Sequence, residues 1–356
     1  MLVAIFAVSS AVVWLAGTRL SKATDILCKR FRIGEALGGA ILLAVATNLP
    51  EIAITSSGAL SGNLGVAVGN ILGGVAIQTV VLVLLDRFGI DTTISLTHRA
   101  GSLKLVIEGL LVVCVLVLTI MATQLPPSVI VFRLTPGGVM ITLFWLLGLW
   151  LIGRAKSGLP WQDAAHASRS RDPGEKEPSN DRGNNTEVTS DGSTAKAAVI
   201  FLLAAVATLV CGVLLEESGS AIANHLGMSG VVFGATALAA ATALPEVSTG
   251  FALTKLHDYE LAVSDILGGN AFLPVLFLLA ELISGRAVLP HAQGTDIYLA
   301  ALGVLLTSIY LGGLIFRSKR TVAGVGVDSL LVLILYGLGM AGLFAIAAAP
   351  TIGGTQ

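Results

Sequence analysis

Long apolar stretches, separated by short polar connections, make up most of this chain. Ten such stretches can be marked, and most could form a helix of about 20 residues, the length that crosses the hydrocarbon core of a membrane. The pattern therefore predicts an all-α membrane protein with about ten transmembrane helices, near residues 2–20, 35–57, 64–85, 103–124, 136–153, 196–215, 230–253, 260–283, 295–316 and 327–349.

One long polar stretch, residues 154–196, interrupts this pattern. It holds seven basic and seven acidic residues and has too little apolar surface to fold by itself. We expect three parts: a first five-helix repeat at 1–153, a polar cytoplasmic linker at 154–196, and a second five-helix repeat at 197–356. Five is an odd number of spans, so the second repeat must cross the membrane in the inverted sense.

The positions of the basic residues predict the orientation. If the N-terminus lies outside, only Arg133 and Arg286 of the 21 Lys and Arg residues fall on the outer side, and the other 19 face inward. Cytoplasmic connections of membrane proteins carry such an excess of Lys and Arg. We therefore expect an integral protein of the plasma (inner) membrane, with both termini outside and the 154–196 loop in the cytoplasm.

Composition narrows the classes of function. Hydrophobic residues make up 54% of the chain and charged residues 12%, with a mean hydropathy of +0.87. The lipid bilayer is thus the main expected partner, and a net charge of −1 gives no basic surface for nucleic acid. Three cysteines without a CxxC spacing predict neither a disulfide framework nor a zinc site. Without catalytic or nucleotide-binding motifs, we expect no enzyme, no cofactor and no obligate protein partner.

A pair of short motifs occurs twice, 195 residues apart. AVATNLPE (44–51) matches AAATALPE (239–246), and AVGNILGG (67–74) matches AVSDILGG (262–269). Both copies place a glutamate in strongly apolar sequence, where an ionisable residue usually marks a functional site. Equivalent acids in two inverted repeats predict one shared ion site at the repeat interface.

The residue types of the motif suit a hard cation. Proline lacks an N–H and breaks the helix, so Pro50 and Pro245 should free backbone carbonyls beside the glutamates. Residues four apart share one helix face, which brings a threonine hydroxyl close to each carboxylate. Calcium is bound by about 6–8 such oxygens. The candidate cation ligands are Glu51, Glu246, Asp265, Asn70, Thr47 and Thr242.

The two copies differ at one position of the second motif, where Asn70 corresponds to Asp265. Three acids then lie within the membrane, and either a cation or a proton must offset their charge. A site that always holds an ion is the physical basis of obligatory exchange. Other uses remain open: Asn70 could join two helices by a hydrogen bond, and the two threonines could bond their own backbone.

Other acids are not counted among the ligands. Glu108 follows Lys104 by four residues and is interpreted as an interfacial ion pair. Asp86 and Glu281 lie near the ends of apolar segments and are expected to be solvated. Glu216 and Glu217 lie near the outer mouth, where they could attract cations, but the preferred interpretation is the solvated start of a loop.

The double motif resembles the alpha repeats of the cation/calcium antiporter superfamily, and most closely those of its sodium/calcium exchanger branch. The match rests on Thr47-x-x-Pro50-Glu51 with Gly69-Asn70-Ile71-x-Gly73, and on Thr242-x-x-Pro245-Glu246 with Asp265-Ile266-x-Gly268-x-Asn270. The resemblance implies that Glu51 and Glu246 are central ligands shared by sodium and calcium. It also implies that the two threonines add oxygens and that Asn70 and Asp265 complete the site.

The implied function is secondary active antiport of calcium against sodium, by alternating access at a midplane carboxylate site. The chain departs from the family pattern at Asn48 and Ala243, where serine is common, and at Gly74 and Gly269, where the family has Gly-Ser-Asn. These changes remove hydroxyls and leave ion selectivity open. The alternative is an antiporter of the same fold with another ion pair, such as calcium/proton, potassium-dependent or magnesium exchange. The extra glutamate typical of the proton-coupled branch is absent after Gly69-Asn70.

Overall fold

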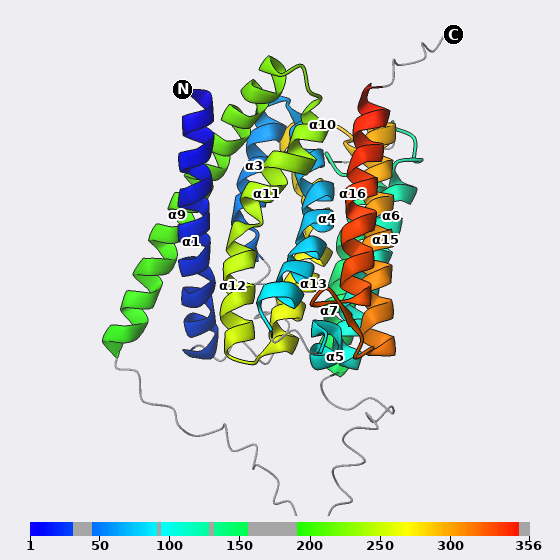
Figure 1. The fold of residues 1–356 in the computed structure, drawn as a ribbon. Helices are drawn as coiled ribbons and strands as arrows, with labels where there is room; N and C mark the ends of the chain where they lie inside the picture. Colours follow the sequence, from blue (N-terminus) through cyan, green and yellow to red (C-terminus); the bar gives the residue numbers. More distant parts are fainter. Residues whose placement is uncertain (31–44, 91–93, 128–131, 156–190, 349–356) are drawn as a thin grey trace, which may run out of the picture.

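The computed structural model describes residues 1–30, 45–90, 94–127, 132–155 and 191–348, and they are almost entirely helical (Figure 1). Before the linker the helices are α1 (Leu2–Arg30), α3 (Leu49–Ser61), α4 (Leu64–Phe88), α5 (Leu96–Ala100), α6 (Leu103–Ala122) and α7 (Pro136–Ala155). After it come α9 (Asp191–His225), α10 (Gly230–Phe233), the π-helical turn η2 (Gly234–Leu238), α11 (Ala239–Thr242), α12 (Leu244–Lys255), α13 (Tyr259–Phe272), η3 (Leu273–Val275), α14 (Leu276–Ser284), η4 (Leu289–His291), α15 (Gly294–Phe316) and α16 (Val327–Ala348). A two-stranded hairpin, β1 (Thr321–Val322) and β2 (Val325–Gly326), precedes α16.

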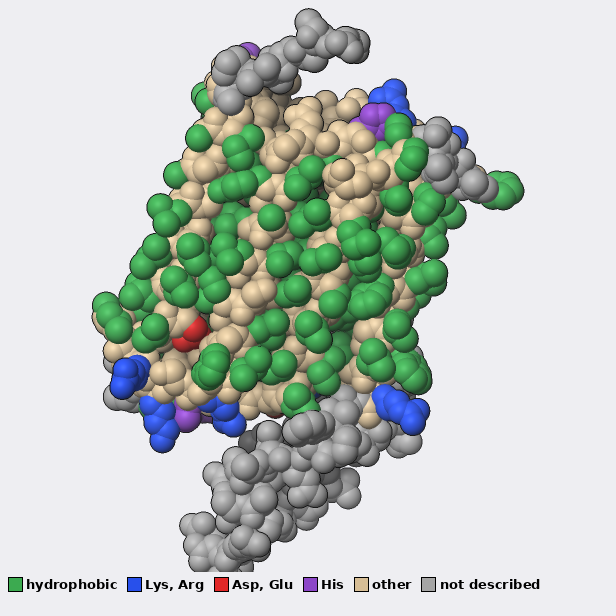
Figure 2. All heavy atoms as spheres, turned by 90° about the vertical axis from the view of Figure 1, so that its right-hand side faces the viewer, with side chains coloured by type: hydrophobic (Ala, Val, Ile, Leu, Met, Phe, Trp, Pro, Cys, Tyr) green, Lys and Arg blue, Asp and Glu red, His purple; other side chains and the backbone are tan. Residues whose placement is uncertain are grey.

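The described residues contain eight helices that are long and apolar enough to cross a membrane, or nine if the bent pair Gly230–Thr242 and Leu244–Lys255 counts as one span. The prediction of an all-α membrane protein is therefore confirmed. The remaining expected span, 35–57, begins outside the described residues, and only its end is seen as α3. Hydrophobic side chains cover the middle of the face in Figure 2, and Lys and Arg side chains gather at its rims, as expected for a surface that meets lipid.

The ends of the chain are arranged as inverted repeats require. The start of α1 and the end of α16 lie at one face of the molecule, whereas α9 starts at the opposite face (Figure 1). Helices α1 and α9 lie side by side at one edge and share a small core around Leu20 and Ala204. The other helices form a larger body with its own continuous core.

The prolines break their helices where the sequence predicts. Pro50 and Pro245 each occupy the first turn of a new helix, α3 and α12 respectively. In the second repeat the chain bends by 40° between the helical segments on either side of Ala243. The π-helical turn η2 precedes this bend, so the backbone departs from α-helical pairing twice within one span. Such irregular backbone is tolerated at membrane depth only where protein or a polar cavity surrounds it.

Glycines let the two repeats approach each other closely. A Cβ added to Gly69 would lie 2.8 Å from the Cα of Val231, and one added to Gly234 would lie 2.9 Å from the backbone nitrogen of Asn70. Helix α4 therefore packs directly against the backbone of α10 and η2. Gly73 makes a third such contact, since its added Cβ would overlap Ala235. In the other repeat, the position equivalent to Gly73 is Gly268 and the position equivalent to Ala235 is residue 40. Residue 40 lies outside the described part of the chain.

Two predicted segment ends were wrong. The first segment was expected to end near residue 20, but α1 continues to Arg30. The sixth segment was expected to end near residue 215, but α9 continues to His225. The acidic residues that suggested an end lie inside this helix, and Glu216 is buried against the first repeat, where its carboxylate accepts hydrogen bonds. The helix need not end where an acid can be satisfied internally.

Candidate cation site

The two glutamates of the repeated motif occupy equivalent positions in the first turns of α3 and α12. Their exposed fractions are 1% for Glu51 and 7% for Glu246. Both carboxylate oxygens of Glu51 and Oε2 of Glu246 are buried without a hydrogen-bond partner. The partial positive charge at a helix N-terminus favours a carboxylate there, but it does not replace the lost hydration. A bound cation would supply the missing interactions.

Asn70 of helix α4 also lies at this site. Helix α4 crosses η2, and this crossing brings Asn70 close to Thr242. The Thr242 hydroxyl donates to Oδ1 of Asn70 at 3.4 Å and also lies within 3.3 Å of the Ala239 carbonyl oxygen. Both side chains are buried, and the Asn70 Nδ2 has no partner. Thr242 is also close enough to the Glu51 carboxylate to interact with it. Residues of both repeats thus meet at one place.

Asp265 lies on α13 and is half-buried. The Thr249 hydroxyl of α12 donates to its Oδ2 at 3.4 Å. Glu51 and Asp265 are both near enough to Glu246 to repel it electrostatically, and no described Lys or Arg side chain pairs with any of the three acids. Three carboxylates without a basic partner make a strongly cation-attracting centre.

Carboxylates alone do not complete a metal shell in this conformation. Among the described residues, no three His, Cys, Asp or Glu side chains come within the range of a shared metal ion. A cation here must also use hydroxyl, amide or backbone oxygens. Calcium accepts such mixed oxygen shells, and the freed backbone at the two proline breaks supplies further carbonyls.

Thr47 is the least defined of the six candidates. It is half-buried, immediately before the break, and the Asn48 amide lies 3.4 Å from its hydroxyl. Its role as a ligand stays a prediction, as do the roles of the other five.

Two further buried amides are absent from the predicted ligand set, although Asn270 belongs to the matching motif. Gln78 of α4 and Asn270 of α13 are almost fully buried, and Oε1 of Gln78 and Oδ1 of Asn270 have no hydrogen-bond partner. The Asn270 amide donates to Thr79 at 3.5 Å. A Cβ built on Gly269 would lie 3.5 Å from Oε1 of Gln78 and 3.6 Å from Nδ2 of Asn48. The available signal was an amide in the middle of each third span, a position that is expensive in lipid.

The predicted pair of Lys104 and Glu108 is confirmed. Lys104 Nζ lies 3.4 Å from Oε1 of Glu108. Ser264 joins the pair, because its hydroxyl donates to Glu108 at 2.9 Å and lies 3.1 Å from Lys104 Nζ. This network ties α6 to the residue preceding Asp265.

The expectation that Asp86, Glu216 and Glu281 are solvated was wrong. Their exposed fractions are 1%, 0% and 0%. Glu216 accepts hydrogen bonds from Ser57 at 2.8 Å and from Asn63 at 3.3 Å. The other two accept bonds at the starts of distant helices. Hydroxyl, amide and backbone donors in the folded chain replace the water that hydropathy assumed.

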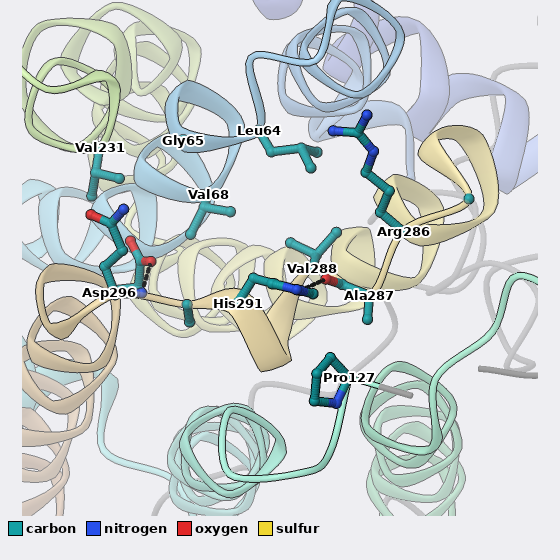
Figure 3. Close-up of a pocket in the computed structure, with 13 residues that line it drawn as sticks. Leu64, Gly65, Val68, Pro127, Val231, Arg286, Ala287, Val288, His291 and Asp296 are labelled. Atoms are coloured by element: carbon teal, nitrogen blue, oxygen red, sulfur yellow. Dashed lines mark hydrogen bonds between the residues drawn. The ribbon is translucent and has the colours of Figure 1, made fainter. Parts of the chain in front are cut away.

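An open cavity of about 590 Å³ lies beside the start of α4 and contains none of the six candidate residues (Figure 3). Its wall includes Arg286 and His291, and the His291 ring nitrogen Nδ1 lies 2.7 Å from the Ala287 carbonyl oxygen. The Asp296 carboxylate accepts a hydrogen bond from the Gln293 N–H at 2.7 Å. The carboxylate site is therefore separate from this cavity.

The family model described as "Sodium/calcium exchanger protein" matches residues 1–153 and 196–350 of this chain. The chain belongs to this family. Its members are transporters, so the expectation that the protein is not an enzyme is confirmed, and the chain is a membrane protein of the cation/calcium antiporter superfamily.

Individual relatives agree with this assignment. The inner membrane protein YrbG of Escherichia coli (strain K12) is 27% identical over 311 residues, covering 87% of each chain. Among solved structures, the fold is similar to that of the sodium-calcium exchanger NCX_Mj, with a TM-score of 0.59 and 18% identity over 96% of this chain and all of that one. It is also similar to the H+/Ca2+ exchanger CAX, with a TM-score of 0.65 and 12% identity over 97% and 86% of the two chains. At these identities, similarity to the two structures shows a shared fold only.

Proposed function

We propose that this protein is a secondary active antiporter that exchanges calcium for sodium at the site formed by Glu51, Glu246, Asp265, Asn70, Thr47 and Thr242. The observation that supports this most is the pair of buried glutamates with unsatisfied oxygens at equivalent helix breaks. Carboxylate charge favours a divalent cation, and the same oxygens suit sodium. Competition of both ions for one set of ligands couples their fluxes.

Alternating access requires a part of the fold that moves past the site. Helices α1 and α9 are suited to this, because each touches the proline break of the opposite repeat through a glycine. A Cβ on Gly17 would lie 2.7 Å from Pro245, and one on Gly212 would lie 3.2 Å from the Pro50 carbonyl oxygen. Gly17 and Gly212 are themselves 195 residues apart, so the two contacts are equivalent. At these two points no side chain of α1 or α9 interlocks with the proline break, but sliding of the pair must break the hydrogen bond between Glu216 of α9 and Ser57 of α3.

Proton coupling is the second candidate. The H+/Ca2+ exchanger shares the fold, and Asp265 adds a third acid that could carry a proton for part of the cycle. The neutral Asn70 at the equivalent place in the first repeat, and the lack of a further glutamate after it, favour sodium.

Gradient dependence decides between these candidates. In proteoliposomes loaded with sodium, an outward sodium gradient is expected to drive uptake of calcium-45, and external sodium should compete with calcium. The control is potassium loading at the same ionic strength, with and without an imposed pH gradient. Calcium flux that ignores sodium and follows the pH gradient would replace the first proposal by the second.

The orientation also remains a proposal, with both termini outside and the 154–196 loop in the cytoplasm. In a variant without Cys28, Cys114 and Cys211, a cysteine at Gly183 is expected to resist an impermeant thiol reagent in intact cells. A cysteine at Gly354 should react. The control is permeabilised cells, in which both should react. Labelling at Gly183 alone in intact cells would reverse the orientation.

A further inference from the structure

Two buried carboxylates, Asp86 and Glu281, lie outside the cation site and occupy equivalent places in the two repeats. They are 195 residues apart, the same offset that relates Glu51 to Glu246. Each follows the second-motif residue of its own repeat by 16 positions: Asp86 follows Asn70, and Glu281 follows Asp265. Both are almost completely buried, and neither pairs with a described Lys or Arg.

Asp86 joins the end of α4 to the start of α16. Its Oδ1 accepts a hydrogen bond from the Leu96 N–H at 2.6 Å, and its Oδ2 accepts one from the Gly326 N–H at 2.7 Å. Gly326 immediately precedes α16, the last span of the second repeat. The third span of the first repeat is thus bonded to the fifth span of the second.

Glu281 makes the reciprocal connection. It lies in α14, at the end of the third span of the second repeat, and accepts the Thr135 hydroxyl at 2.8 Å and the Thr135 N–H at 3.3 Å. Thr135 immediately precedes α7, and its hydroxyl oxygen accepts the Gly138 N–H at 3.2 Å. The third span of the second repeat is therefore bonded to the fifth span of the first.

The two connections lie at opposite ends of α4. The cavity of Figure 3 places Leu64, at the start of α4, beside Gly285 and Arg286, just after Glu281. Asp86 follows Leu64 by 22 residues, which corresponds to about 33 Å along a helix. One connection therefore lies toward each surface of the membrane.

Both carboxylates fit against a glycine. A Cβ on Gly138 would lie 2.5 Å from Oε2 of Glu281, and one on Gly326 would lie 3.2 Å from Oδ2 of Asp86. A larger residue at 138 would displace Glu281, and one at 326 would crowd Asp328, Ser95 and Asp86 together. The shared features are a buried acid, a backbone N–H before the fifth span, and a glycine that makes room.

We propose that Asp86 and Glu281 form two equivalent clasps that hold the third span of each repeat at a fixed height against the fifth span of the other. These spans carry Asn70 and Asp265, so the clasps are positioning residues for the cation site. The proposal rests on the proposed function. The clasps keep the ligand-bearing body rigid, so that binding energy is not spent on aligning α4 with α13.

A second carboxylate near Asp86 supplies a control variant. Oδ1 of Asp328 would lie 2.6 Å from a Cβ on Gly326, so a second carboxylate is close to Asp86. Like charges that share a buried site repel. Asp328→Asn removes this repulsion and keeps both bonds of Asp86, whereas Asp86→Asn weakens the bonds themselves.

The test measures cation affinity and thermal stability together in the full-length protein. Asp86→Asn and Glu281→Gln are each expected to raise the half-saturating calcium concentration about tenfold, since small misplacements of binding groups have large effects. Both should also lower the unfolding midpoint in detergent. Asp328→Asn and the exposed Glu217→Gln should keep wild-type affinity. Asp86→Glu and Glu281→Asp, which keep the charge, should lose less calcium affinity than Asp86→Asn and Glu281→Gln.

A pairwise cycle tests the bond itself. Thr135→Val removes the hydroxyl whose hydrogen bond Glu281 accepts. The double variant Thr135→Val, Glu281→Gln should be no less stable than the less stable of the two single variants, because the stability losses of interacting residues do not add. Wild-type affinity in both Asp86→Asn and Glu281→Gln would overturn the positioning role, whatever happens to the unfolding midpoint. If the wild-type protein binds sodium but not calcium, only the proposed exchange of calcium for sodium is refuted. The positioning role is then tested by comparing the sodium affinities of the same variants with that of the wild type.

Discussion

Glu51→Gln and Glu246→Gln are each expected to lower calcium exchange at least about 100-fold, because binding of a divalent cation in a low-dielectric site depends strongly on carboxylate charge. Glutamine keeps the shape of the side chain and removes one formal charge. Both oxygens of Glu51 and Oε2 of Glu246 are buried without a hydrogen-bond partner, so little structural bonding is lost. Exchange is measured as calcium-45 uptake into proteoliposomes, and folding is checked by size-exclusion chromatography in detergent.

The symmetry of the site sharpens this prediction. The two glutamates occupy equivalent first turns, so the two variants should be about equally impaired, while Glu217→Gln should behave as wild type. Asp265→Asn is the informative contrast, since it makes the second repeat match Asn70 of the first. We expect it to remain active with altered ion preference and pH dependence. Wild-type transport by either glutamate variant would remove that residue from the shared ligand set.

The repeated motif predicted where the helix breaks and the two buried glutamates lie, because its chemistry is local. Glu51 and Glu246 stand next to their prolines, so the same eight residues specify the helix break and the acid. The link between Thr242 and Asn70 follows from the inverted repeats, since glycines in α4 allow the two repeats to touch. Local patterns combined with one symmetry thus predict the fold class and the equivalent positions of the buried acids.

Sequence patterns failed where distant contacts decide. Asp86 accepts a hydrogen bond from Gly326, which lies 240 residues away, and Glu281 accepts one from Thr135, which lies 146 residues away. Hydropathy is averaged over a residue and its sequence neighbours, so it predicts that an acid near the end of an apolar segment is exposed to water. The N–H groups that replace that water belong to other helices, and only tertiary structure brings them near. The exact offset of 195 residues was the available signal for this pair.

The crossing of α4 with η2 gives the prediction with the largest effect on folding. Gly73→Ala is expected to destabilise the protein by at least about 1–3 kcal/mol, the usual penalty of overpacking. The added Cβ would lie 2.6 Å from the Ala235 Cβ and 2.8 Å from the Ala235 carbonyl oxygen. Since the opposing atoms belong to the backbone and a Cβ, no side-chain rotation can relieve the overlap. The two helices must separate, and Asn70 would then move away from Thr242.

Gly337→Ala is the matched control, because this glycine lies on the exposed side of α16 and an added Cβ would meet no described atom within 4 Å. Alanine favours helix more than glycine does, so this variant should be as stable as wild type or slightly more so. The measurements are the unfolding midpoint in detergent and calcium uptake in proteoliposomes. Gly73→Ala should lose both stability and transport. If it kept the wild-type midpoint and rate, the contact between α4 and η2 would not be as close as described, and the joining of the two repeats at Asn70 and Thr242 would need another explanation.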